Sequence, residues 1–250
     1  MNATTPRTAI VTGGTRGIGR AVSLQLAREG ARVLALYGRN REAAEALEAE
    51  ARAAGLTIET LRGDLTHPEK FAALVEEIRA KAERIDVLVH CAASGVHRKA
   101  AELSAKHVRW TLDINVVAIH ELLTALIERM PSGGRIVGIT SSGGTRVIPF
   151  YSAVGASKGA LESLFRHYAS ELGPRGIAVN LVCPGLVLTD AVDAFPDREA
   201  RVAKTLEATP SGRLTTPADV AQVVSFLCGP AAAQIIGQTL VVDGGKTLSS

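Results

Sequence analysis

Short runs of β-branched and other apolar residues alternate along this chain with longer alanine-rich stretches, in which apolar positions recur every three or four residues. The short runs predict buried strands, and the longer stretches predict amphipathic helices. The predicted strands are residues 8–11, 32–36, 57–61, 87–90, 135–139, 178–182 and 239–242. The predicted helices are residues 17–29, 41–54, 68–83, 111–130, 152–172 and 217–228. This alternation indicates an α/β fold with a parallel sheet.

One stretch departs from the alternation. Residues 183–213 carry scattered prolines and charged residues where a further strand and helix would stand. Long irregular excursions in compact domains are often lids or binding loops, so we expect a flap on the substrate side of the site. The rest of the pattern shows no repeat or linker, and a chain of 250 residues often forms one α/β domain. We therefore expect a single domain over residues 1–250.

The composition is that of a globular protein, with 46% hydrophobic and 21% charged residues. The net charge of +3 is small and the basic residues are dispersed, which argues against nucleic-acid binding. Cys91, Cys183 and Cys228 lie far apart and fit no metal-ligand spacing, so they indicate thiols in a reducing compartment. No signal-peptide segment stands at the amino terminus, and no uninterrupted run approaches ~20 apolar residues. We expect a cytoplasmic protein with no membrane partner.

A glycine-rich segment, Thr-Gly-Gly-Thr-Arg-Gly-Ile-Gly over residues 12–19, follows the first predicted strand and opens the first predicted helix. Glycines at such a turn allow a close approach of backbone to ligand. The helix amino terminus offers unpaired N–H groups and a partial positive charge to a pyrophosphate. The segment therefore predicts a dinucleotide site.

The residues after the second predicted strand indicate which dinucleotide is bound. A site for the unphosphorylated ribose commonly places an acidic residue there, whereas this chain reads Leu-Tyr-Gly-Arg-Asn-Arg over residues 36–41. Guanidinium groups such as those of Arg16 and Arg39 bind phosphate through charge-assisted hydrogen bonds, which favours NADP over NAD. The alternative, that Arg39 and Arg41 only cap a solvated helix start, stays open. Asp64 and Leu65, after the third strand, are expected at the adenine end.

Together these residues resemble the short-chain dehydrogenase/reductase family over essentially the whole chain. The matching positions are residues 12–19, Asp64, Asp86, Asn115, Ser141, Lys158 and residues 180–185 and 237–245. The resemblance implies a Rossmann-like, doubly wound sheet of seven parallel strands with helices on both faces, and a homotetramer. It also implies a set of cofactor-binding residues: Gly13, Thr15, Arg16, Gly17, Ile18, Gly19, Arg39, Asp64, Leu65, Ala92, Lys158, Pro184, Gly185, Val187 and Thr189.

The chain departs from the family pattern in two places. Residues 90–93 read His-Cys-Ala-Ala where the family has Asn-Asn-Ala-Gly, and Val154 stands where the usual tyrosine precedes Lys158 by four residues. The nearest upstream phenol is Tyr151, seven residues before Lys158, which is the spacing of the enoyl-acyl-carrier-protein reductases. Residues 92–96, 189–191, 195–199 and 209–213 also resemble the NADPH-dependent FabL-type branch. That likeness implies reduction of the C2=C3 double bond of an enoyl thioester, as in fatty acid biosynthesis.

Helix geometry agrees with this shift in direction. Positions i and i+7 lie nearly on one face of a helix, and Tyr151 would stand about 4.5 Å further along than a tyrosine at i+4. In carbonyl reduction the hydride is added to the carbon that bears the protonated oxygen. In enoyl thioester reduction it is added to Cβ, two bonds from the carbonyl carbon, so the oxygen donor must reach farther. The displaced phenol suits the second reaction.

The resemblance implies a role for each polar residue of the site. Tyr151 would stabilise the enolate, and Lys158 would hold the nicotinamide ribose and lower the Tyr151 pKa by favouring phenolate. The proton at Cα would come from Tyr151 or water. Ser141 orients a substrate oxygen or makes only a strand-end hydrogen bond, and Asn115 braces the helix near Lys158.

Further polar residues follow the fourth strand. Ser94 and Gly95 line the acyl pocket or form a plain loop turn. His90 and His97 have no third ligand near them in the sequence, so we expect no metal. Cys91 reads as a small buried hydrophobe rather than a nucleophile.

Three functions remain open. The first is an enoyl thioester reductase that acts on an acyl-carrier-protein-linked or CoA-linked substrate, of fatty acid synthesis or of a secondary pathway. The second is a carbonyl reductase in which Ser141, Tyr151 and Lys158 act on a 3-oxoacyl group, ketone or quinone. The third is a catalytically silent dinucleotide-binding subunit. The acyl chain length also stays open.

Overall fold

The computed structural model describes residues 6–65, 67–189, 195 and 197–248. Seven parallel strands form one sheet in the order β3-β2-β1-β4-β5-β6-β7, which confirms the predicted fold class. All seven predicted strands are present, and β6 continues two residues further than predicted, to Pro184. The strands are β1 Thr8–Thr12, β2 Arg32–Tyr37, β3 Ile58–Arg62, β4 Val87–His90, β5 Arg135–Ile139, β6 Ala178–Pro184 and β7 Thr239–Val242.

Five of the six predicted helices are found within two residues of their predicted ends. They are α1 Gly17–Arg28, α2 Arg41–Ala53, α3 Pro68–Lys81, α6 Ser152–Leu172 and α9 Pro217–Cys228. The sixth, predicted at residues 111–130, is wrong in its start and its regularity. It begins as α4, Ala105–Leu112, passes through a π-helical turn at Asp113–Val117, and continues as α5, Ala118–Leu126. Ser104 caps its first turn by accepting a hydrogen bond from the backbone of His107.

The predicted irregular flap is partly wrong. Its first two residues, Cys183 and Pro184, belong to β6, and it contains a helix, α8, at Arg198–Glu207. The helix has no buried residue, which is why no hydrophobic period marked it in the sequence. Residues 190–194 and 196 of the flap lie outside the described part of the chain.

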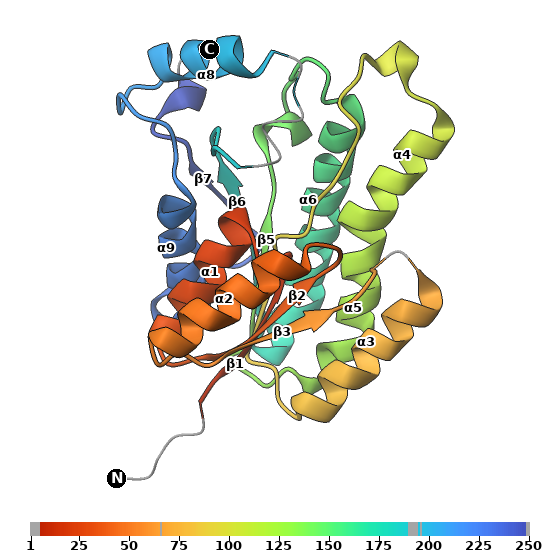
Figure 1. Cartoon of the computed structure of the whole chain (residues 1–250), viewed down its shortest axis with the longest axis vertical. Coiled ribbons are helices and arrows are strands. Elements are labelled where there is room, and N and C mark those ends of the chain that lie inside the picture. Colours follow the sequence, from red (N-terminus) through yellow and green to blue (C-terminus); the bar gives the residue numbers. More distant parts are fainter. Residues whose placement is uncertain (1–5, 66, 190–194, 196, 249–250) are drawn as a thin grey trace.

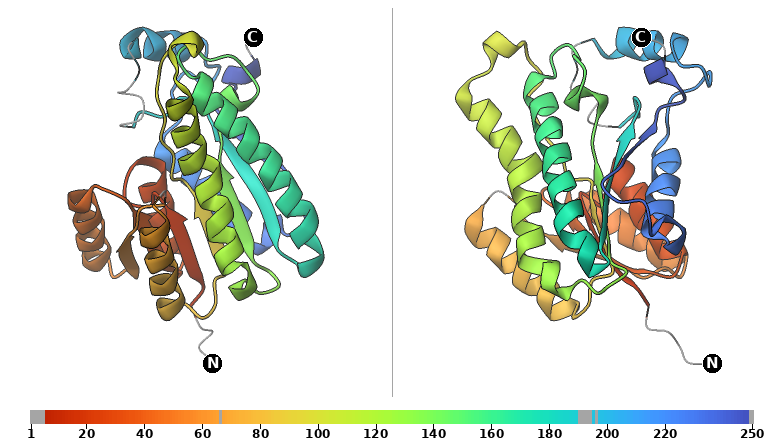
Figure 2. Two further views of the ribbon diagram at one scale, coloured as in Figure 1. Left: turned by 90° about the vertical axis from the view of Figure 1, so that its right-hand side faces the viewer. Right: turned by 180° about the vertical axis from the view of Figure 1, so that it is seen from behind.

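Two apolar cores lie on opposite faces of the sheet because successive side chains of a strand point to opposite faces. Ile10 of β1 joins the core under α3, α5 and α6, whereas its neighbours Ala9 and Val11 join the core under α1, α2 and α9. The two helical layers are visible on either side of the strands in Figures 1 and 2. This sandwich holds the strand ends, and any site built on them, in fixed positions.

One helical stretch, Ala105–Arg129, is long and apolar enough to cross a membrane by length and composition. Its apolar face is already used in the protein core, to which α5 contributes Ile119, Leu122 and Leu123. Packing on the sheet therefore accounts for its composition.

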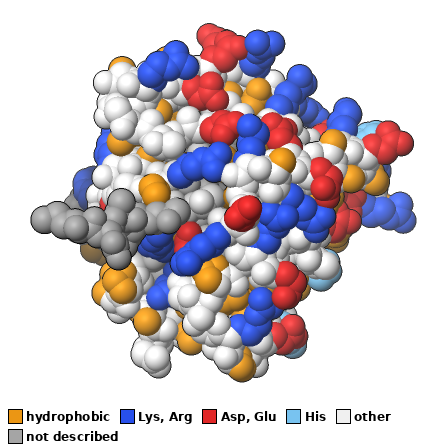
Figure 3. Space-filling view, turned by 90° about the horizontal axis from the view of Figure 1, so that it is seen from below, with side chains coloured by type: hydrophobic (Ala, Val, Ile, Leu, Met, Phe, Trp, Pro, Cys, Tyr) orange, Lys and Arg blue, Asp and Glu red, His pale blue; other side chains and the backbone are white. Residues whose placement is uncertain are grey.

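The two edges of the sheet differ in what they carry. The carboxyl ends of the strands point to the edge at which α8 and the last helical turn, Lys246–Leu248, also lie (Figure 1). The opposite face shows Lys and Arg side chains interspersed with Asp and Glu (Figure 3). Ligands of open α/β sheets bind outside the carboxyl ends, so we place the site at the α8 edge.

Candidate functional site

The glycine segment lies where β1 ends and α1 begins. Gly13 has φ +64°, and a Cβ there would stand 2.9 Å from the Ala92 backbone, so a side chain at this position has no room. Arg16 is the extended N-cap residue of α1, and no side chain caps the first turn. The first N–H groups of α1 are therefore available to an anionic ligand, and the cradle fits a dinucleotide pyrophosphate.

The segment after β6 approaches the same cradle. Gly185 donates its N–H to the Val242 carbonyl at 2.9 Å, and Val187 is buried and pairs with Thr215. A Cβ at Gly17 would lie 3.1 Å from the Thr189 methyl group. The structure thus brings the predicted residues Pro184–Thr189 together with the glycine segment. Thr15 is buried in the cradle, and Ile18 packs toward the α1 core.

At the end of β2 the two arginines differ. Arg41 is paired with Glu45 one turn later at 2.6 Å, and α2 is capped by Asn40, which accepts from the Ala43 N–H at 2.9 Å. Arg39 is exposed, and within the described part of the chain its side chain makes no hydrogen bond or ion pair. Arg41 therefore belongs to the solvated start of α2, as the alternative interpretation expected. Of these two arginines, Arg39 is the one that can bind a ribose phosphate.

The residues predicted to lie at the adenine end of the cofactor, Asp64 and Leu65, follow β3. Leu65 is partly buried and packs against the core under α3, so it serves the fold. Asp64 is half-buried beside it.

Tyr151 and Lys158 stand two turns apart on α6, as predicted. Tyr151 is the N-cap residue of α6, and the preceding residue, Phe150, has φ +64°, a conformation that non-glycine residues rarely adopt. The Tyr151 ring lies against Gly143, where a Cβ would come within 2.5 Å of the ring. The Ser141 side chain lies near enough to its phenol to lower the Tyr151 pKa in part. The Ser141 hydroxyl accepts a hydrogen bond from the Gly143 N–H at 3.2 Å, so the predicted strand-end hydrogen bond is present, and its orienting role on a substrate stays a prediction.

Val154 fills the position from which a tyrosine at four-residue spacing would extend. It is buried, and a Cβ on Gly95 would meet its Cγ2 at 2.1 Å. Gly95 was predicted to line the acyl pocket. Position 95 must be a glycine, because a side chain there would collide with Val154. Ser94 has its backbone N–H and carbonyl bonded to the Asn115 amide, both at 2.9 Å, and its side chain is exposed.

Asn115 lies in the π-helical turn between α4 and α5 and is completely buried. Besides Ser94, its amide donates to the Ser157 hydroxyl at 2.9 Å. The side chain therefore joins the loop after β4 to α6 next to Lys158, which agrees with the bracing role predicted for it. π-helical turns in α-helices are frequent at functional sites.

Lys158 is buried with 5% of its surface exposed, and its Nζ donates to the Ile139 carbonyl at 2.7 Å. Burial lowers the pKa of Lys158 to about 8, against the opposing influence of Cys91, Cys183 and Glu162. The ammonium is thus present at neutral pH and is lost about two pH units sooner than that of an exposed lysine.

The expected lowering of the Tyr151 pKa is wrong. Burial raises the pKa of Tyr151, and the hydrogen bond with Ser141 opposes this only in part. Desolvation of the phenolate outweighs any attraction to the ammonium. Tyr151 is therefore a neutral O–H donor at neutral pH. Burial likewise raises the pKa of the Cys91 thiol to about 12, as expected of a packing residue.

The two histidines near the site have separate surroundings. His90 is fully buried with its Nδ1 2.9 Å from the Thr12 hydroxyl, and burial, followed by the charge of Lys158, lowers the pKa of His90 to about 3. His97 lies instead beside Tyr151, with ring centroids 5.7 Å apart. Among the described residues no three His, Cys, Asp or Glu side chains are grouped to hold a metal ion.

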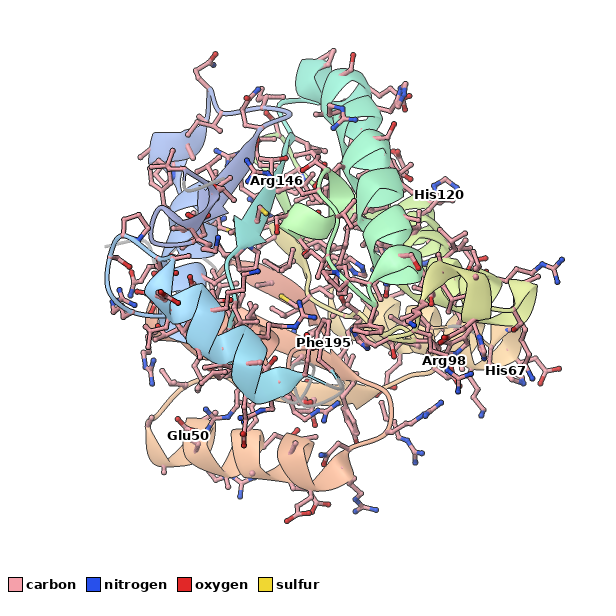
Figure 4. The ribbon with its side chains drawn as sticks, turned by 90° about the horizontal axis from the view of Figure 1, so that it is seen from above. Glu50, His67, Arg98, His120, Arg146 and Phe195 are labelled. Carbon is pink, nitrogen blue, oxygen red and sulfur yellow. The ribbon has the colours of Figure 1, made fainter. Side chains whose placement is uncertain are left out.

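Sequence reasoning missed an aromatic cluster at this edge. His97 and Phe195 lie beside the Tyr151 ring, and the Arg201 side chain of α8 lies over the Phe195 ring. Phe195 lies near the centre of the view onto this edge, beside α8 (Figure 4). Only the likeness of residues 195–199 to the FabL-type flap marked this region beforehand.

Lys158 leads to a prediction about pH. If its ammonium holds a ligand hydroxyl, kcat/KM should fall as the pH rises through about 8, because the charged form is lost there. Steady-state rates between about pH 6 and about pH 10 measure this limb. A Lys158→Arg variant keeps its charge over this range, so its residual activity should show no such limb. An unchanged limb in that variant would assign the titration to another group.

Comparisons with known proteins agree with this geometry. The family model described as enoyl-(acyl carrier protein) reductase matches residues 13–247. The chain is similar to a 1-cyclohexenylcarbonyl-CoA reductase of Streptomyces collinus, with 34% identity over 96% of this chain and 86% of that protein. It is also similar to a 3-oxoacyl-(acyl-carrier-protein) reductase of Staphylococcus aureus, with 32% identity over 96% of this chain and 97% of that protein.

A solved structure gives the same result. The short-chain dehydrogenase from Burkholderia cenocepacia in complex with NADP superposes with a TM-score of 0.86 and 33% identity, over 96% of this chain and 98% of that one. The seven-stranded parallel sheet agrees with this relationship. The chain therefore belongs to the short-chain dehydrogenase/reductase family.

Proposed function

We propose that this protein is an NADPH-dependent reductase of the C2=C3 double bond of an enoyl thioester. The observation that carries the proposal is the position of the phenol beside Ser141. That phenol is Tyr151, at the start of α6 and seven residues before Lys158, while Val154 occupies the usual place. An oxygen donor set back along the helix suits hydride addition at Cβ, as argued above.

The cradle fits NADP, the cofactor in the Burkholderia relative's structure. Its pyrophosphate would lie at the amino terminus of α1 between Gly13 and Thr189, and the ribose phosphate near Arg39. Lys158 would hold the nicotinamide ribose hydroxyls. When bound, the reduced nicotinamide supplies the hydride.

The chain's own residues stabilise the charge that develops on the substrate. Tyr151, which remains protonated, donates its O–H to the thioester oxygen as negative charge builds there. Contacts with Gly143 and Phe195 hold the Tyr151 ring in place beside Ser141. The proton that completes the product at Cα comes from Tyr151 or water. Asn115 keeps the loop after β4 in register with α6, so the pocket wall and the donor stay together.

The names of the relatives support a thioester substrate. One relative is named a reductase of a CoA ester with a ring double bond, and the matching family model is described by enoyl reduction. We propose either acyl carrier protein or CoA as the carrier of the substrate. A homotetramer, and the lack of nucleic-acid and membrane partners, remain predictions.

One observation favours a second function. Ser141 lies beside the Tyr151 phenol, and carbonyl-reducing relatives bind a substrate oxygen with a serine–tyrosine pair. The Staphylococcus relative is named for reduction of a 3-oxoacyl group. Carbonyl reduction is therefore the alternative. The buried Lys158 and the Tyr151 phenol beside Ser141 favour both reactions over a silent subunit.

Oxidation of NADPH, followed with matched thioesters, tests the proposal. We expect turnover of crotonoyl-CoA with kcat/KM at least about tenfold above that of acetoacetyl-CoA, a difference of about 1.4 kcal/mol in transition-state binding. The two substrates share carrier and chain length and differ only in the reducible bond. Faster turnover of acetoacetyl-CoA would establish the alternative, and NADPH binding without turnover of either would reject both.

A further inference from the structure

The Phe195 side chain lies against the ring of Tyr151. Their ring centroids are 5.9 Å apart and their planes differ by 17°, an offset-stacked arrangement. Phe195 comes from the flap and Tyr151 from the start of α6, so their contact joins the flap to α6. The space beside the phenol ring is therefore bounded on one side by a second ring.

Arg201 of α8 fixes Phe195 from another side. Its guanidinium carbon stands 4.2 Å from the Phe195 ring centroid, a cation–π contact, and only 14% of its side chain is exposed. Arg201 is itself held by Asp197, one turn earlier, at 3.0 Å, and reaches the Pro149 carbonyl at 3.4 Å. The guanidinium thus ties α8 to the loop that precedes Tyr151.

His97 completes the cluster from the loop after β4. Its ring centroid is 4.2 Å from that of Phe195 and 5.7 Å from that of Tyr151. Burial, and then the charge of Arg201, lower the pKa of His97, so the ring is neutral at neutral pH and packs as an aromatic group. Phe195 is therefore in contact with three groups from three separate segments.

We propose that Phe195, held by Arg201 and His97, is the end wall of the acyl pocket and restricts this enzyme to short acyl chains. The inference rests on the proposed function, because it assumes that the acyl thioester binds at Tyr151. A ring held from three sides does not move aside for a chain as a single exposed ring would. The methylene groups of a longer acyl chain that reach past Phe195 must stay in water, so they add nothing to the affinity for the thioester.

Equilibrium binding of saturated thioesters tests the wall without any turnover. Each methylene taken out of water raises affinity about fourfold, so an open pocket would bind octanoyl-CoA far more tightly than butyryl-CoA. In the NADP-loaded wild type we expect the two dissociation constants, measured by calorimetry, to be about equal. In Phe195→Ala we expect octanoyl-CoA to gain at least about tenfold over butyryl-CoA, and in Phe195→Leu a smaller gain of the same sign.

Two charge-removing variants on α8 test the support. Arg201→Met should shift the ratio in the direction of Phe195→Ala, because the wall loses its fixed partner. Lys204→Met removes an exposed charge one turn later on the same helix and should leave the ratio unchanged. Equal shifts in the two variants would overturn the role of Arg201.

The two proposals fail in different ways. A wild-type preference for octanoyl-CoA, or an unchanged ratio in Phe195→Ala, would overturn the wall whichever bond is reduced. Turnover of 3-oxoacyl thioesters alone would overturn the proposed enoyl reductase activity. The ratio of the octanoyl-CoA and butyryl-CoA dissociation constants would still measure the length of the pocket. The kcat/KM ratio of octenoyl-CoA to crotonoyl-CoA should follow the binding ratio across the same variants.

Discussion

Replacing Tyr151 with phenylalanine is expected to lower kcat by about a hundredfold to a thousandfold, the usual cost of removing one preorganised oxyanion donor. The ring should stay in place, because Gly143 and Phe195 pack against its carbon atoms rather than its hydroxyl. The cofactor cradle at α1 is built from other segments, so the dissociation constant for NADPH should stay within about twofold of the wild-type value. Single-turnover rates and fluorescence titration with NADPH measure the two quantities separately.

Tyr168→Phe is the matched control for this experiment. Tyr168 lies further along the same helix and also uses its hydroxyl, which is 2.8 Å from Nδ1 of His120. The control should lose no activity, because this pair is at the surface and far along the helix from Lys158. Wild-type turnover in Tyr151→Phe would mean that another group, with Ser141 the first candidate, donates to the substrate oxygen.

Replacing Gly13 with alanine is expected to weaken NADPH binding by at least about tenfold. An alanine at φ +64° costs about 1–2 kcal/mol in backbone strain. Its Cβ would also stand 2.9 Å from the Ala92 backbone, and neither segment is a flexible side chain that can give way. The loop after β4 and the glycine segment must then separate, which displaces the cradle from the ligand.

Gly30→Ala separates strain from crowding. Gly30 has φ +87°, and a Cβ there meets nothing within 4 Å. This variant should lose about 1 kcal/mol of stability, seen in thermal unfolding, yet bind NADPH as the wild type does. Equal losses of affinity in both variants would show that general destabilisation, and not the contact with Ala92, controls the cradle.

The strands and most helices could be predicted because burial on both faces of a parallel sheet leaves continuous apolar runs. The start of α4 could not, since its capping box uses His107 at the position where glutamate or glutamine usually marks a helix start. The helix α8 could not be predicted, because it buries no residue and so leaves no apolar pattern in the sequence. Its place depends on contacts such as that of Arg201 with Phe195.

The residues of the site likewise fall into those that could be predicted from the sequence and those that could not. Tyr151 and Lys158 stand on one helix at a spacing that helix geometry dictates, and the glycine segment links β1 to α1, so both parts of the site could be predicted. The contact of His97 with Phe195 joins positions almost a hundred residues apart, and no spacing rule reaches that far. The direction of the Tyr151 pKa was predicted wrongly because attraction to Lys158 can be inferred from a motif, whereas burial of the phenol requires the folded structure.

The contact between Val154 and Gly95 limits how this catalyst can evolve. A tyrosine at position 154 would need the space that the loop after β4 now takes, and that loop also lies over Gly13 through Ala92. Moving the phenol back by one turn is therefore not a single mutational step, because the first substitution would disturb the nucleotide cradle before the new acid could function. An engineered exchange of the two spacings therefore has to transplant the loop after β4 together with the start of α6.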